Sequence, residues 1–148
     1  SISEITKNLF ASLSGSVYNI TNEEFKANIN KARTAHINWV QTLKRIVDEG
    51  VIYPLQTNST KCAFGHFYYA ISVKHPTIKN DWDAIEEIHD NLHIYGQKVI
   101  DAVKKGQASE AVEFYAEAEK LSRHIVELLY KIEKEVDIQT QSGVQLMG

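Results

Sequence analysis

The chain has 148 residues, which fits one domain large enough to bury a hydrophobic core. Its hydrophobic share of 43% and its charged share of 24% are ordinary for a globular protein. The formal net charge of -3, with acidic and basic residues interleaved, argues against a nucleic-acid-binding face, and no apolar run approaches the roughly 20 residues of a membrane span.

Turn-forming residues are scarce, with only 7 glycines and 2 prolines in the whole chain. This favours long helices over a β-sandwich or barrel, which needs turns at short intervals. The first elements in chain order are helically spaced apolar residues within positions 1–20. We expect this segment to be a helical extension or the end of an upstream coiled coil.

A long amphipathic helix is predicted to begin after Thr21 and to end at Gly50. Thr21 and Glu24 have the spacing of a capping box, and glycine is a favoured residue at a helix C-terminus. The apolar residues between these signals recur with coiled-coil spacing. His36 occupies this apolar stripe, at a position where Leu or Ile would be expected.

A turn-rich stretch, Pro54–Thr60, precedes a short aromatic segment, Lys61–Lys74, which contains the single cysteine, Cys62. We expect the aromatic segment to end at Pro76, because a residue before proline avoids the helical region. One cysteine cannot form an internal disulfide, so we expect a reducing, cytoplasmic compartment.

A second long helix is predicted with Asn80 as its N-terminal cap and Gly106 just beyond its end. Its apolar stripe contains His89, and His93 lies one turn further along the same face. Two histidines at positions i and i+4 bring their rings close enough to hold one metal ion.

A last helix is predicted over residues 109–136, and residues 139–148 are expected to form a disordered tail. We therefore predict an all-α fold, an antiparallel four-helix-type bundle with a short inserted aromatic helix. Its main domain is expected to cover residues 21–138.

Three histidines and one cysteine combine into a candidate metal site. A single buried histidine is ordinarily explained by a hydrogen bond to a carbonyl or hydroxyl group. Three of them with one thiol supply four donors, the number in a closed tetrahedral zinc site. Thiolate and imidazole donors suit Zn(II) and disfavour calcium or magnesium. The sequence predicts one Zn(II) per chain, held by His36, Cys62, His89 and His93.

The segments His36–Trp39, Cys62–Phe67 and His89–His93 resemble, in order, the motifs of the chemoreceptor zinc-binding (CZB) domain family. The resemblance covers roughly residues 25–105. It departs from the family pattern at Phe67, where many members have Trp, which keeps an aromatic side chain. The resemblance implies that the family's ligands, three histidines and one cysteine, fall on the four predicted donors.

The resemblance also implies a cytoplasmic regulatory domain that is not itself an enzyme. Such domains are typically attached to bacterial chemoreceptors or diguanylate cyclases. We therefore expect a homodimer with an attached or partner signalling domain, in chemotaxis or nucleotide signalling. We expect the zinc site to respond to zinc or to oxidants.

Two other interpretations remain open at this point. A di-iron bundle that binds oxygen or senses redox state would use Glu86 and His89 as a Glu-x-x-His motif, but such sites need two of these motifs and further carboxylates. A metal-free dimerisation module would leave the histidines as core residues. His66, four residues after Cys62, is the best substitute ligand. An enzymatic use of Cys62 as a nucleophile lacks an evident oxyanion hole.

Overall fold

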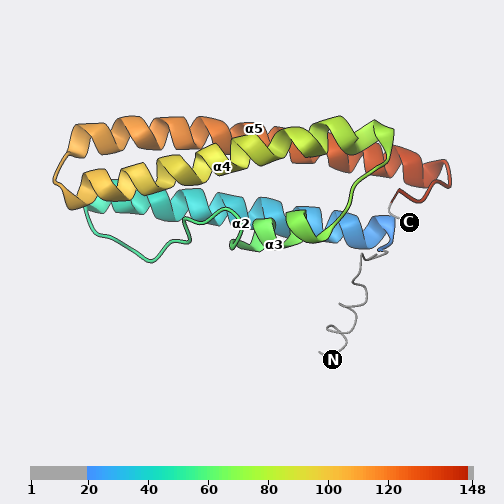
Figure 1. Cartoon of the computed structure of the whole chain (residues 1–148), viewed down its shortest axis with the longest axis horizontal. Helices are drawn as coiled ribbons and strands as arrows, with labels where there is room; N and C mark the ends of the chain where they lie inside the picture. The colour runs from blue at the N-terminus through green and yellow to red at the C-terminus, as the bar shows by residue number, and fades with distance from the viewer. Residues whose placement is uncertain (1–19, 147–148) are drawn as a thin grey trace, which may run out of the picture.

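The computed structural model describes residues 20–146, which form an all-helical bundle (Figure 1). Its helices are α2 (Asn22–Glu49), α3 (Ala63–Ala70), α4 (Pro76–Lys104) and α5 (Ala108–Gln141). The structure confirms the predicted all-α fold with a short inserted helix. The helix predicted within residues 1–20 falls, except for residue 20, outside the described part of the chain.

The three long helices lie side by side, and the short α3 lies along α2 (Figure 1). Helix α5 runs antiparallel to both α2 and α4. The segment between α2 and α4, which includes α3, carries the chain back along the bundle, so α2 and α4 run in the same direction (Figure 1). Within residues 20–146, no helix combines the length and apolar character needed to cross a membrane.

Helix α2 begins and ends where local chemistry predicted. The backbone N–H of Glu24 donates to the Thr21 hydroxyl at 3.0 Å, and the Thr21 N–H donates to the Glu24 carboxylate at 2.9 Å. Gly50 ends the helix with a φ of 68°, a left-handed conformation that costs glycine little. The predicted capping box and C-terminal glycine are both confirmed.

Helix α4 begins five residues earlier than the sequence predicted. His75 is the N-terminal cap, its side chain accepts a hydrogen bond from the Thr77 N–H, and Pro76 is the first helical residue. Proline suits this position because its missing N–H would have no partner in the first turn and its φ is already helical. The prediction that Asn80 caps the helix is wrong, and Asn80 is exposed within α4.

An aromatic cluster packs α3 onto the bundle. The rings of Tyr68 and Trp82 stack with centroids 4.6 Å apart, and the Tyr68 hydroxyl donates to the Trp82 carbonyl at 2.7 Å. Phe25 of α2 meets Trp82 with centroids 5.5 Å apart, and the fully buried Phe64 meets it at 6.4 Å. Aromatic contacts of this kind stabilise beyond the area that they bury. They fix α3, and with it the residue that precedes it, between α2 and α4.

The expectation of a disordered tail over residues 139–148 is wrong as far as Leu146. Helix α5 continues to Gln141, and the chain then folds back so that Leu146 is buried. The buried Asn22 side chain accepts from the Leu146 N–H at 2.9 Å and donates to the Val144 carbonyl and the Thr140 hydroxyl, each at 2.8 Å. A buried amide with all these partners ties the two ends of the described chain together.

We predict that Asn22→Ala lowers the free energy of unfolding by about 1–3 kcal/mol, because it leaves the Leu146 N–H and the Val144 carbonyl without their partner. Urea denaturation monitored by circular dichroism measures this change. Asn80→Ala is the matched control, and its effect should stay within about 0.5 kcal/mol because Asn80 is exposed. Equal effects of the two substitutions would show that the Asn22 contacts contribute no net stability.

Candidate metal centre

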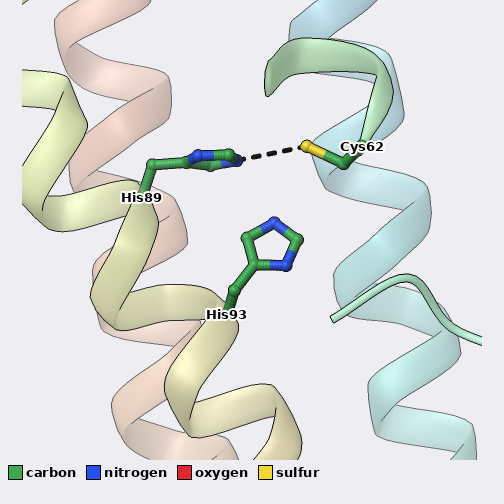
Figure 2. Close-up of side chains that lie close together, drawn as sticks. All are labelled: Cys62, His89 and His93. Atoms are coloured by element: carbon green, nitrogen blue, oxygen red, sulfur yellow. Dashed lines mark hydrogen bonds between the residues drawn. The ribbon is translucent and has the colours of Figure 1, made fainter. Parts of the chain in front are cut away.

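Three of the four predicted donors converge at one point between α3 and α4. The donor atoms of Cys62, His89 and His93 all lie within 4.8 Å of one another. Figure 2 shows the Cys62 thiol facing the two imidazole rings, with the Cys62 sulfur 3.4 Å from His89 Nε2. Cys62 thus meets two histidines that lie 27 and 31 positions later in the sequence.

Helix α4 contributes both histidines of this cluster. His89 and His93 are one turn apart, so their rings leave the same face of the helix, with centroids 4.6 Å apart and planes at 75°. Both side chains are buried, with exposed fractions of 2% and 3%. The surrounding α4 residues on this face are apolar, so the pair is held in a desolvated position.

Cys62 is placed by the start of α3, for which it is the N-terminal cap. Its sulfur accepts a hydrogen bond from the Gly65 N–H at 3.2 Å, and its thiol donates to the Ser59 carbonyl at 3.7 Å. Burial raises the pKa of the Cys62 thiol, and the backbone N–H groups of Gly65 and Phe64 act in the opposite direction. The thiol is therefore protonated at neutral pH without a cation nearby, and a bound metal would ionise it.

His36 lies beside this cluster but outside the set of donors within 4.8 Å. Its ring centroid is 5.1 Å from that of His89, and its side chain is 3% exposed. With Cys62 and His93 it lines a cavity of about 250 Å³ that is partly open to solvent. The structure therefore places His36 at the site, and its role as the fourth ligand stays a prediction.

Three imidazole nitrogens at this site have no hydrogen-bond partner. Within residues 20–146, the buried side-chain nitrogen and oxygen atoms that lack a partner are Nδ1 and Nε2 of His36 and Nδ1 of His93. Leaving such atoms unpaired costs about 1–3 kcal/mol each, which native proteins rarely tolerate. A divalent cation coordinated by these nitrogens would satisfy them, so the donors fit a zinc ion.

Burial also sets the protonation state of the histidines. It lowers the pKa of His36 to about 4 and that of His89 to about 3, with a further contribution from the neighbouring imidazoles. The pKa of His93 is lowered for the same reason, against the effect of nearby backbone carbonyls. The rings are thus neutral at neutral pH, which is the form that binds a metal.

Trp39 covers one side of the centre. Its ring centroid lies 4.9 Å from that of His93, and its indole N–H donates to the Gln56 carbonyl at 2.8 Å. Gly96 lies one turn after His93 in α4. Because it has no side chain, it leaves the space that the Trp39 indole fills. A Cβ at Gly96 would lie 2.4 Å from the Trp39 ring. Trp39 therefore both shields His93 and fastens the loop after α2.

The competing metal ligands named from the sequence do not reach the centre. His66 is exposed, and so are Glu86 and Glu87. The Glu86 carboxylate instead accepts a hydrogen bond from the Tyr69 hydroxyl at 2.8 Å. Among the described residues the donor cluster contains no carboxylate. This argues against the di-iron interpretation, which needs several carboxylates.

Sequence reasoning missed two polar residues beside the centre, Ser59 and Asp90. The Ser59 hydroxyl donates to the Asp90 carboxylate at 2.5 Å across 31 positions of the chain. Asp90 lies between the two motif histidines and Ser59 precedes the Cys62–Phe67 segment, but no sequence signal pairs them, so only the folded structure shows that they meet.

Residues 36–100 match a family model described as the chemoreceptor zinc-binding domain. The matched segment contains His36, Cys62, His89 and His93. Searches against curated proteins and against solved structures found no match.

We predict that the metal-free protein loses stability as the pH falls below about 6.5. The unfolded histidines, with a pKa near 6.5, bind protons first, whereas burial keeps the pKa of His36 at about 4 and that of His89 at about 3. Their contribution to stability is complete above the unfolded pKa and declines towards the folded pKa. The loss at pH 5 is about 2 kcal/mol for each residue.

Urea denaturation at several pH values in the presence of a chelator measures this dependence. His36→Phe should reduce the slope between pH 6 and pH 4.5, because one buried titrating group is gone. His124→Gln is the control, since His124 is exposed, and its slope should equal that of the wild type. A flat stability profile in the wild type would contradict the prediction.

Proposed function

Because residues 36–100 match the family model of the chemoreceptor zinc-binding domain, we propose that this chain is a zinc-binding regulatory domain of a bacterial signalling protein. The observation that carries the proposal is the set of buried imidazole nitrogens without partners beside the Cys62 thiol. A protein that used these histidines only as core residues would pair them with carbonyl or hydroxyl groups.

Cys62, His89 and His93 would hold the ion, and His36 would complete a four-donor set. Zn(II) supplies a redox-inert tetrahedral cross-link, and with four protein donors it has no open position for a catalytic water. For this reason we propose a sensory role and no enzymatic activity. The ligands come from α2, from the start of α3 and from α4, so the ion would connect three separate segments.

Metal binding is thereby coupled to packing. The donors already lie close together in the fold. Without the ion, however, buried imidazole nitrogens have no partner and the Cys62 thiol stays protonated. Ligands that come from separate segments convert binding free energy into folding free energy. Zinc occupancy would therefore stabilise the position of the Cys62 segment against α4. This gives the domain two states that an attached output domain could distinguish.

The proposed cellular setting follows from the family. We propose a cytoplasmic homodimer whose signal passes to a methyl-accepting or diguanylate cyclase partner. The metal-free dimerisation module is the remaining alternative, and it is disfavoured by the unpaired nitrogens of His36 and His93. Metal analysis of protein purified without chelators or a metal-affinity column separates the two.

We predict one zinc per chain in such a preparation, and a large loss of affinity in Cys62→Ser. The hydroxyl of serine is a much harder and less acidic donor than a thiol, so it is a poor ligand for zinc. Competition with a chromophoric chelator measures the affinity, and zinc at about 100 times its Kd should stabilise the wild type by about 2.7 kcal/mol. His66→Ala is the control and should bind zinc as the wild type does, since His66 is exposed.

The same titration on His36→Ala tests the fourth ligand. A loss of affinity comparable with that of His89→Ala assigns His36 to the metal. An unchanged affinity limits the protein donors to Cys62, His89 and His93. The proposed function is contradicted if the wild type is purified without zinc and its stability does not change when zinc is added.

An oxidant is the second proposed input. A peroxide would convert the Cys62 thiol to a sulfenic acid with release of water, and the oxidised sulfur is a poorer zinc donor. Cys62 is only partly buried and lines the cavity that opens to solvent, so a small oxidant has a path to it. We predict that hydrogen peroxide releases zinc in proportion to Cys62 oxidation, followed with a zinc-sensitive dye and by mass spectrometry. Zinc retained at full oxidation of Cys62 would contradict this input.

A further inference from the structure

A hydrogen bond outside the donor set joins the Cys62 segment to α4. The Ser59 hydroxyl donates to the Asp90 carboxylate at 2.5 Å, in a partly buried position, and Asp90 directly follows His89. We propose that Ser59 and Asp90 are positioning residues that hold the Cys62 thiol against the α4 histidines. The proposal deepens the zinc-binding function and rests on it.

Ser59 contacts the start of α3 through its backbone as well. Its carbonyl oxygen accepts from the Cys62 thiol at 3.7 Å. The same oxygen would lie only 2.0 Å from a Cβ at Gly65, so the loop packs directly on the first turn of α3. A displacement of Ser59 therefore displaces the surroundings of the thiol, and the Ser59 side chain is what connects this point to α4.

The turn between Ser59 and Cys62 is held by its own hydrogen bonds. The Asn58 side-chain oxygen accepts from the Thr60 N–H at 2.9 Å and from the Thr60 hydroxyl at 2.7 Å. The Lys61 N–H donates to the Asn58 carbonyl at 3.0 Å. A turn stabilised in this way moves as a unit, so fixing Ser59 on α4 also restricts Cys62.

Asp90 is suited to this positioning role and not to ligation. Its oxygens do not belong to the group of atoms within 4.8 Å of one another, and among the described residues it forms no ion pair. Its one side-chain partner in the described part of the chain is Ser59. Loss of an outer residue that orients a metal ligand typically lowers metal affinity by about 10- to 100-fold.

The first test uses metal-free protein and does not depend on zinc. The rate at which iodoacetamide alkylates Cys62 should rise about five- to tenfold in Ser59→Ala and in Asp90→Ala, the factor that corresponds to one lost hydrogen bond. Asp101→Ala is the matched control, because Asp101 is an exposed α4 carboxylate that accepts a hydrogen bond from Gln97. It should react as the wild type does. Circular dichroism verifies that each variant keeps its helices.

The second test measures zinc affinity by chelator competition. Ser59→Ala and Asp90→Ala should bind zinc about 10- to 100-fold more weakly than the wild type. Asp90→Asn separates the hydrogen bond from the charge, since its amide oxygen still accepts from Ser59. It should stay close to the wild type in both tests. Cobalt-substituted protein should show a weaker thiolate-to-cobalt absorption band in the two alanine variants, which a purely global loss of stability would not produce.

Each other outcome has a defined meaning. If Ser59→Ala and Asp90→Ala match Asp101→Ala in either test, the proposal is overturned, because positioning must affect both the thiol and the metal. If Asp90→Asn is as impaired as Asp90→Ala, the charge acts and the hydrogen bond does not, which also overturns it. If the wild type binds no zinc, the proposed function fails, while the alkylation rates still decide whether this bond positions the thiol.

Discussion

The desolvation of three imidazoles around one thiol is the constraint on which the rest of this structure depends. His36, His89 and His93 are almost completely buried, and nitrogens of two of them have no partner. Burial favours their neutral forms and also keeps the Cys62 thiol protonated, so the metal-free centre has donors but no charge. A bound cation would stabilise this arrangement in two ways, because it would coordinate the unpaired imidazole nitrogens and ionise the Cys62 thiol.

The chain builds this centre from local features that are individually ordinary. A helical spacing of four residues places two rings on one face of α4. A helix cap aims the Cys62 sulfur at the first turn of α3, and the aromatic cluster around Trp82 holds that helix in place. Two glycines make the close approaches possible, Gly65 against the loop and Gly96 against Trp39. The specificity of the site comes from bringing these features together.

The sequence revealed those parts of the fold that have short-range signals. The capping box at Thr21 and the apolar stripes predicted the helices, and histidines on those stripes predicted the donors. The Asn80 prediction failed because asparagine is a good helix cap in isolation, whereas His75 followed by Pro76 makes a cap five residues earlier. The ordered C-terminal turn and the Ser59–Asp90 bond were beyond prediction, since both join residues far apart that no periodicity connects.

The distribution of contacts along α2 indicates which segment would move when a metal ion binds or leaves. The N-terminal half of α2 is joined to α5 by ion pairs from Lys26 and Arg33, and the Asn22 contacts secure its start. Beyond His36 the ion pairs of α2 in the described chain stay within the helix, and apolar side chains hold it to the bundle. The loop over residues 50–62 is irregular and reaches the long helices through few hydrogen bonds, among them those to Glu49, Trp39 and Asp90. Local stability is lowest where such contacts are few. Gain or loss of the ion would therefore act first on this loop and on Cys62, while the three long helices stay packed.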